Sequence, residues 1–243
     1  MKALGRKLKS MGRRTELVVD GKIIDLDVRH SQRARRILLK IDPRFGAQLI
    51  VPRGVPSREA LSFAAEKGEW LIDRLADFPT PIPFRESAIV PVLGRPHRIR
   101  LTTTTDLFQS RVRCESGELL TNCHPDDTAE HIRTWFRDNA RNAFSLRAGA
   151  AAGRIGAEVS RISVRDPRTR WGSCSATGSL SFSWRLFMAP EWVLDYVVAH
   201  EVAHLLEMNH GRGFWRLVDR LVDRIDDAKS WLRESGPRLH RYG

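Results

Sequence analysis

A mostly apolar stretch over residues 190–206 is interrupted by two histidines and a glutamate in the pattern His200-Glu201-Val202-Ala203-His204. Apolar residues on almost every side predict a buried helix, and Pro190 suits its first turn. Because helical positions four apart lie on one face, His200 and His204 can direct their imidazoles to one point. Polar groups inside an apolar helix destabilise it unless something satisfies them. A divalent metal ion would satisfy all three side chains, so this segment constrains the fold more than any other.

The same residues form the H-E-x-x-H pattern of zinc hydrolases. A catalytic zinc site needs only three protein ligands, because it keeps one position for water, and His210 is the expected third ligand. Asn209-His210-Gly211 contains residues that tolerate left-handed backbone, so we expect the helix to end there and the chain to bring His210 back. Glu201 lies one step around the helix, where it can reach that water without being a ligand. The alternative is a chance occurrence of the pattern on an ordinary helix.

An ordered run of motifs surrounds this helix, namely Arg170-Trp171-Gly172-Ser173-Cys174, Ser183-Trp184-Arg185, Met188-Ala189-Pro190, Asp195-Tyr196-Val197-Val198 and Phe214-Trp215. With this run, residues 168–215 resemble the YgjP-like metallopeptidase family of minimal zincins, which is related in pattern to the SprT-like proteases. The front half adds similar motifs in Arg33-Ala34-Arg35-Arg36, Val51-Pro52-Arg53-Gly54 and Trp70-Leu71. The resemblance implies one zinc ion per chain, held by His200, His204 and His210, with Glu201 as the catalytic carboxylate.

The reaction implied is hydrolysis of a peptide or protein substrate by a zinc-activated water, with Glu201 as general base. Candidate substrate contacts are Arg170, Ser181 and Trp184. A strand expected over residues 179–185 either lines the cleft as an edge strand, which an extended peptide can join, or packs Phe182 and Trp184 into the core. The candidates for a second oxyanion donor are Arg170, His240 and Tyr242.

Two rival functions remain open from the sequence. One is a metal-dependent nucleotide phosphoanhydride hydrolase, although the chain has no P-loop or glycine-rich phosphate cradle. The other is a DNA-associated, SprT-like protease factor. A purely structural zinc fits the pattern poorly, because three histidines beside a glutamate leave the fourth position open.

The composition of the 243-residue chain is that of a soluble globular protein, with 42% hydrophobic and 29% charged residues. No run approaches the roughly 18 apolar residues of a membrane span, and no apolar segment follows the basic N-terminus as in a secretion signal. Three cysteines without C-x-x-C spacing argue against disulfides, so we expect a reducing cytoplasm. Cys174 is expected to pack in a loop rather than to act as a nucleophile.

A net charge of +12 raises the question of a nucleic-acid partner. Residues 1–14 hold six basic side chains and no acidic one, which predicts a flexible electrostatic arm. The alternative is a helix packed through Leu4, Leu8 and Met11. Basicity of this kind supports weak, salt-sensitive contact with nucleic acid. The sequence indicates no membrane partner and carries no signal for an oligomeric state.

Helices and antiparallel strands are expected in blocks, which predicts an α+β fold. Strands are expected near residues 15–20, 22–29, 36–42, 47–51, 88–93, 97–103, 110–114, 118–122, 161–164 and 179–185. Helices are expected near residues 56–76, 125–155, 190–206, 214–222 and 226–234. The chain is expected to divide into a basic tail over residues 1–14, a β-rich subdomain with one helix over 15–124, and a zincin-like core over 125–243. In that core the H-E-x-x-H helix packs on a small sheet.

Overall fold

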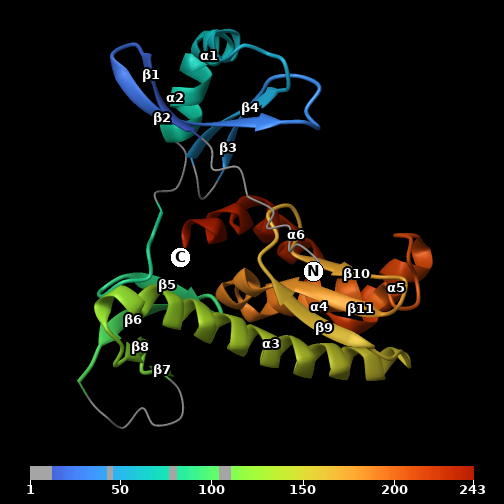
Figure 1. Ribbon diagram of the computed structural model, residues 1–243. Coiled ribbons are helices and arrows are strands. Elements are labelled where there is room, and N and C mark those ends of the chain that lie inside the picture. Colours follow the sequence, from blue (N-terminus) through green and yellow to red (C-terminus); the bar gives the residue numbers. More distant parts are fainter. Residues whose placement is uncertain (1–12, 43–45, 77–80, 104–110) are drawn as a thin grey trace, which may run out of the picture. The chain divides into compact units, whose positions relative to one another are not determined.

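The computed structural model describes residues 13–42, 46–76, 81–103 and 111–243 (Figure 1). The chain forms two compact units, Met1–Pro81 and Ile82–Gly243. The boundary expected at residue 124 differs from this division, because Val90, Ile99 and Leu119 belong to the same hydrophobic core as helix α3 (Thr128–Ile155). Of the expected tail, residues 1–12 lie outside the described residues, and the remaining two begin the first strand.

The first unit combines a four-stranded sheet with helices α1 and α2. Its strands are β1 (Arg13–Val19), β2 (Lys22–Ser31), β3 (Leu38–Asp42) and β4 (Gly46–Pro52), in the order β1-β2-β4-β3. The pairs β1–β2 and β3–β4 are antiparallel, whereas β2 and β4 are parallel. Asp20 and Gly21 form the expected hairpin turn, with positive φ angles of 47° and 74°. Such angles match the twist of a two-residue hairpin connection.

The helix expected over residues 56–76 is divided into α1 (Ser57–Glu66) and α2 (Gly68–Ala76). The second helix begins at Gly68, where a Cβ atom would lie only 2.4 Å from a methyl group of Val19. Glycine therefore permits a close approach of this helix to β1. Beneath the helices, Leu26 and Leu49 of the sheet and Leu71 of α2 are fully buried, which forms the core of the first unit.

The second unit begins with β5 (Ile89–Val92), β6 (Arg95–Leu101), β7 (Val112–Glu115) and β8 (Glu118–Thr121). Their order β5-β6-β8-β7 repeats that of the first sheet, with a parallel pair between two antiparallel pairs. The 3₁₀ helix η1 (Pro125–Asp127) and the long helix α3 follow. A further sheet contains β9 (Arg161–Arg165), β10 (Gly172–Cys174) and β11 (Ser179–Ser183). The chain ends with η2 (Trp184–Met188), α4 (Glu191–Ala203), α5 (Arg212–Leu221), α6 (Ile225–Glu234) and η3 (Gly236–Arg241).

Strand β10 lies where the sequence indicated a loop, and it changes the role of its neighbour. The sheet order β10-β11-β9 makes β11 the central strand, antiparallel to β10 and parallel to β9. The alternative of an edge strand over residues 179–185 is therefore wrong. The packing alternative holds instead, because Phe182 and Trp184 are fully buried.

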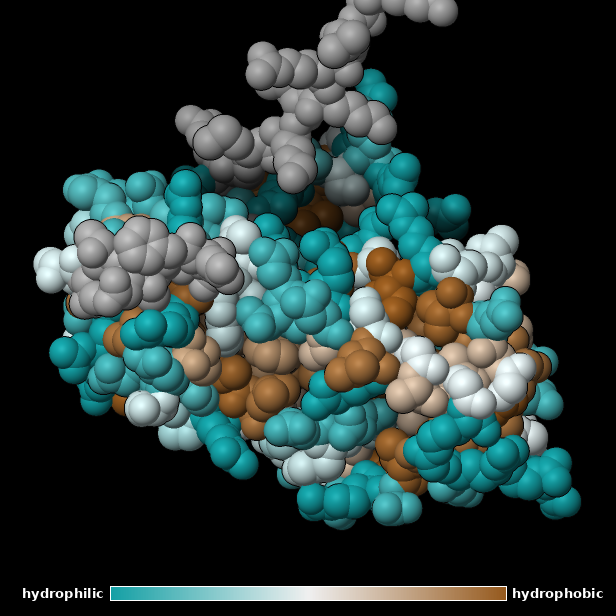
Figure 2. All heavy atoms as spheres, turned by 90° about the horizontal axis from the view of Figure 1, so that it is seen from below, coloured by the Kyte–Doolittle hydropathy of each residue, from teal (hydrophilic) through white to brown (hydrophobic). Residues whose placement is uncertain are grey.

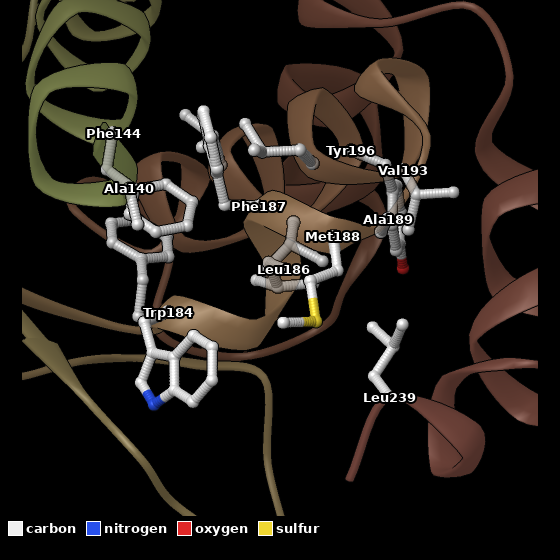
Figure 3. Close-up of a cluster of buried hydrophobic side chains, with 14 of the residues drawn as sticks. Ala140, Phe144, Trp184, Leu186, Phe187, Met188, Ala189, Val193, Tyr196 and Leu239 are labelled. Atoms are coloured by element: carbon white, nitrogen blue, oxygen red, sulfur yellow. The ribbon is translucent and has the colours of Figure 1, made fainter. Parts of the chain in front are cut away.

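The core of the second unit lies against one face of α3. Buried residues recur at every fourth position of that helix, namely Ile132, Phe136, Ala140, Phe144 and Ala148. Phe144 stacks on Phe182 of β11 with ring centroids 4.5 Å apart. Figure 3 shows side chains of η2, among them Leu186, Phe187 and Met188, between this face and residues of α4. Helix α4 is thus enclosed by apolar contacts, as its sequence predicts.

Arg185 is a buried charged side chain within this apolar region, with 2% exposure. Its guanidinium donates to the Asp166 carboxylate, with Nε 2.8 Å from Oδ1. It also donates to the backbone carbonyl groups of Leu239 and Tyr242, at 2.9 and 2.6 Å. These bonds join η2 to η3 and to the residue that follows it.

The α+β class expected from the sequence is confirmed. Helix α4 carries His200 and Glu201, with His204 as its C-cap, and packs on the small sheet through β10, while a β-rich unit precedes it in the chain. No helix among the described residues is both long and apolar enough to cross a membrane. The face of the molecule in Figure 2 mixes hydrophilic side chains with separate hydrophobic patches.

Candidate metal centre

The turn after α4 sets the position of the third histidine. The helix ends at Ala203, earlier than expected, and Leu206 donates its backbone N–H to the Ala203 carbonyl three residues before it. Bonds of this kind tighten the last turn of a helix. The left-handed backbone expected at Asn209-His210-Gly211 is not present, since all three residues are described and none has a positive φ. Gly211 is extended, with φ of −78°, and caps the start of α5.

Three imidazoles converge at this turn. The ligand nitrogens of His200, His204 and His210 all lie within 4.8 Å of one another. The Nε2 atoms of His200 and His210 are 3.1 Å apart. His200 and His204 are half-buried and His210 is exposed, so the cluster opens to solvent on one side. The structure thus brings together the three expected metal ligands.

The chemistry of this cluster fits a zinc ion. Zinc accepts imidazole nitrogens, and three of them leave one position open. His204 Nδ1 lies 3.0 Å from the Glu207 carbonyl oxygen, and donation of its N–H there leaves Nε2 free for a metal. Burial lowers the pKa of His200 to about 4, with His204 and His210 adding to the effect. At neutral pH the His200 ring is therefore uncharged, as metal coordination requires.

A second observation on His200 points the same way. Its Nδ1 atom is buried and has no hydrogen-bond partner among the residues that the structure describes. The ring is instead held by packing, with Tyr196 at 5.9 Å and Phe214 at 4.9 Å between ring centroids. The polar contact of this ring is therefore made by Nε2, which faces His210.

Phe214 of α5 packs against all three histidine rings. Its ring centroid lies 4.6 Å from that of His204 and 4.7 Å from that of His210, in addition to its contact with His200. Phe214 is fully buried. Beside it, the ring of Trp215 lies about 6 Å from those of His200 and His210, and the Lys229 ammonium lies over the Trp215 ring at 4.0 Å. The start of α5 therefore fixes the ligands sterically.

Glu201 follows His200 on α4 and is a buried carboxyl group, with 6% exposure. Burial raises its pKa to about 7, and the Arg170 guanidinium opposes that rise. A carboxyl group that titrates near neutral pH can both accept and release a proton. Gly172 of β10 fixes its place, since a Cβ atom there would lie 2.5 Å from Glu201 Oε1. Strand β10 thus meets the carboxyl group directly.

Two further groups near this carboxyl remain protonated. Burial raises the pKa of the Cys174 thiol, and the charge of Glu201 raises it further. The same two effects raise the pKa of the Tyr196 hydroxyl. A thiol with a raised pKa is a poor nucleophile, which agrees with the expectation that Cys174 is a packing residue.

The expected substrate contacts are placed differently from one another. Arg170 is exposed just before β10 and acts electrostatically on Glu201. Ser181 is half-buried in the central strand β11, opposite Ser173 of β10. Trp184 has no exposed surface and packs on Phe136 with ring centroids 5.8 Å apart. The expectation of direct substrate contact by Trp184 is therefore replaced by a role in the core.

The other two candidates for oxyanion donation lie in the C-terminal segment. His240 is 7% exposed and stacks on Trp171 at 5.4 Å between ring centroids. The Tyr242 carbonyl accepts a hydrogen bond from Arg185. His240 thus packs on the residue that precedes β10, whereas the backbone of Tyr242 is bonded to η2.

Sequence reasoning did not single out Gly172 or Phe214. Each stands in a motif of the family resemblance, Arg170-Trp171-Gly172-Ser173-Cys174 and Phe214-Trp215. Their roles depend on contacts between distant parts of the chain, with Glu201 for the glycine and with the three histidines for the phenylalanine. The motifs were the available signal, but their spacing in the sequence does not indicate which side chains are in contact.

Comparison with known proteins gives one extensive match. Residues 35–235 match the family model described as the YgjP-like metallopeptidase domain. A search of curated proteins found no match. Among solved structures, a matching chain is the metallopeptidase zymogen of Pyrococcus abyssi abylysin, with 18% identity and a TM-score of 0.35. That match covers 38% of this chain and 95% of the other.

Proposed function

The chain belongs to the YgjP-like metallopeptidase family, and we propose that it hydrolyses peptide bonds with a zinc ion held by His200, His204 and His210. The observation that carries the proposal is the convergence of these imidazoles within 4.8 Å at the end of α4, the helix that also carries the buried carboxyl group of Glu201. A bound zinc ion would supply Lewis-acid chemistry and an activated water near neutral pH.

Glu201 acts as the general base in this proposal. It takes the proton of the attacking water on its carboxylate and returns that proton to the amine that leaves. Two observations support the assignment. Its burial gives the carboxyl a pKa of about 7, and the contact with Gly172 limits where the carboxylate oxygens can lie.

Strand β10 is the strand with which we propose that the substrate peptide pairs. It is an outer strand in the order β10-β11-β9, and Gly172 in it touches the catalytic carboxyl group. An extended peptide that pairs with the outer side of β10 by β-addition would bring its backbone next to Glu201. Arg170, exposed just before this strand, would donate to a carbonyl or carboxylate oxygen of the substrate. Ser181 supports β10 from the neighbouring strand.

The decisive experiment separates turnover from metal binding. Zinc-loaded full-length protein is incubated with a fluorogenic peptide library, next to the Glu201→Gln variant. Because Glu201 is not a ligand, the variant should keep its zinc and its fold. Its turnover should fall about 10²–10⁴-fold, the usual contribution of general acid–base catalysis. Zinc is measured by elemental analysis and turnover by fluorescence.

A matched control is Glu207→Gln, which changes an exposed carboxyl in the following turn and leaves the backbone carbonyl that meets His204. Its turnover should stay close to that of the unchanged protein. Nucleoside triphosphates are tested in parallel. Hydrolysis of nucleotides without any hydrolysis of peptides would reject the peptidase proposal, and a fully active Glu201→Gln variant would reject the general base.

A further inference from the structure

A groove of about 820 Å³ lies in the first unit, between the segment that leads into β3 and the helices α1 and α2. Its apolar lining includes Ile37, Leu38 and Leu39 on one side, and Phe63 and Trp70 on the other. Leu38 and Trp70 are 45% and 42% exposed, so large apolar side chains meet solvent here. Apolar surface gathered in a concave site is typical of a binding surface.

The two walls of the groove differ in kind. On the helical side, Glu59 and Phe63 of α1, Lys67 at its C-cap and Trp70 of α2 recur at three- and four-residue spacing along the two successive helices. The other wall is built from residues 35–39, together with Pro52 and Val55. Arg35 and Arg36 lie in a bend, and Leu38 and Leu39 begin β3, so this wall leads directly into the strand.

Strand β3 is also the outer strand of its sheet (Figure 1). It pairs with β4 from Leu38, opposite Ile50, to Asp42, opposite Gly46. No strand in the described part of the chain pairs with its other side. In an antiparallel pair only alternate residues bond to the partner strand, so the remaining N–H and C=O groups of β3 point outward. An outer strand beside a helical groove is the geometry in which an extended peptide adds as a further strand.

The rim of the groove is positively charged. Arg35, Arg36 and Lys67 line it, against one carboxylate, that of Glu59. The three basic side chains are exposed, and none forms an ion pair with another described residue. A site with this charge attracts an anionic ligand and repels a basic one.

We infer that this groove binds an extended, acidic segment of a partner protein, which adds to β3 and places an apolar side chain against Trp70. The basic residues 1–14 of the chain are unsuited to the site, because they carry six positive charges and no negative one. A nucleic acid would satisfy the charge but has no peptide backbone to pair with β3. The inference does not depend on the peptidase activity, since the metal centre belongs to the other unit.

The test uses the full-length Glu201→Gln variant, so that a peptide probe is not consumed. The probe is a short fluorescent peptide with an apolar core flanked by glutamates, and binding is followed by fluorescence anisotropy. We expect saturable binding that weakens about tenfold or more with Arg35→Glu and Arg36→Glu combined, since rim charges govern encounter with a charged ligand. Trp70→Ala should weaken binding comparably, because it removes an apolar contact in the groove.

Matched controls lie in the same unit outside the groove. Arg53→Glu changes an exposed charge, and Ile23→Ala changes an apolar residue that is 66% exposed. Both should bind the probe as the parent protein does. A peptide with N-methylated core residues lacks backbone donors and should not bind. Amide hydrogen exchange over Leu38–Asp42 should slow when the unmethylated peptide is added.

Four results would overturn the inference. They are no saturable binding of the acidic peptide, equal binding of a lysine-flanked peptide, equal weakening by Arg53→Glu, and unchanged affinity for the N-methylated peptide. A single-stranded oligonucleotide is tested as a competitor. If it displaces the probe, and its own binding is weakened by the Arg35 and Arg36 changes, the groove is a nucleic-acid site instead.

Discussion

Each imidazole of the metal centre has its position set by different neighbours. His200 is held on α4 between aromatic rings, and His204 is oriented by the carbonyl of Glu207. His210 stands just before α5, and Phe214 of that helix touches all three rings. Because the third ligand is the most exposed and comes from a turn, it is the ligand whose assignment most needs a direct test.

We predict that His210→Ala loses most of its zinc. Removing a ligand should lower zinc affinity by more than the roughly 10–100-fold that follows loss of an outer partner of a ligand. Competition with a colorimetric chelator measures the affinity. Met208→Ala is the control, because Met208 is 52% exposed in the same turn. Undiminished affinity in His210→Ala would shift the third ligand to an acid such as Asp219 or Asp223.

Gly172→Ala is predicted to impair turnover without removing zinc. The new Cβ atom would overlap Glu201 Oε1 and Cγ, at 2.5 and 2.6 Å, so the carboxyl group must move. Small displacements of a catalytic group can cost about 10²-fold in rate. The control is Gly149→Ala on α3, where a Cβ atom meets nothing within 4 Å. Turnover equal to that of the control would show that Glu201 is not positioned by this contact.

Among single residues, the sequence predicted the positions that follow from helical spacing. It did not predict the positions that depend on contacts between distant parts of the chain. Two histidines four residues apart on an apolar helix must share a face, and that was sufficient to place His200 and His204. The path of the chain to His210 was expected through left-handed residues, yet a tightened helix end and an extended Gly211 produce it. The contact of Gly172 with Glu201 joins residues that no local pattern relates.

Among the elements, β10 and η2 show where local patterns are insufficient. β10 has three residues, too few for an alternation of polar and apolar side chains to be visible. Strand β11 ends at Ser183 because η2 begins there, so the expected strand over residues 179–185 combined two elements. The long helix α3 and the β1–β2 hairpin were predicted well, since the pattern of the helix extends over many residues and the hairpin turn contains Asp20-Gly21.

Arg185 links two of these elements, and Arg185→Ala is predicted to destabilise the second unit strongly. The change removes the Arg185 hydrogen bonds from the Asp166 carboxylate and from two backbone carbonyl groups. Breaking a buried ion pair from one side costs about 3–5 kcal/mol of unfolding free energy. Urea denaturation measures the loss. Arg141→Ala, whose ion pair with Asp138 is more than half exposed, should change stability by less than about 0.5 kcal/mol.

For the whole molecule, the division into two units predicts that residues 82–243 fold and bind zinc without the first unit. The three imidazoles, Glu201 and a continuous hydrophobic core all belong to this part. Residues 82–243 expressed alone should bind zinc at the affinity of the full chain and unfold cooperatively. Aggregation, or a markedly lower zinc affinity, would show that the first unit completes the metal centre.

The boundary between the units could not be predicted from the sequence, because strands β5 to β8 resemble β1 to β4 in pattern and differ only in the hydrophobic core that they join.

The strand order shared by the sheets β1–β4 and β5–β8 also predicts the order in which each sheet folds. In each sheet, hairpins close between neighbours in the chain, whereas the central parallel pair, β2 with β4 or β6 with β8, joins strands that the third strand separates. Local contacts form quickly and distant ones wait for loop closure. Each sheet should therefore assemble as two early hairpins that dock late. The docking of these hairpins, and not their formation, should limit the rate at which each sheet appears.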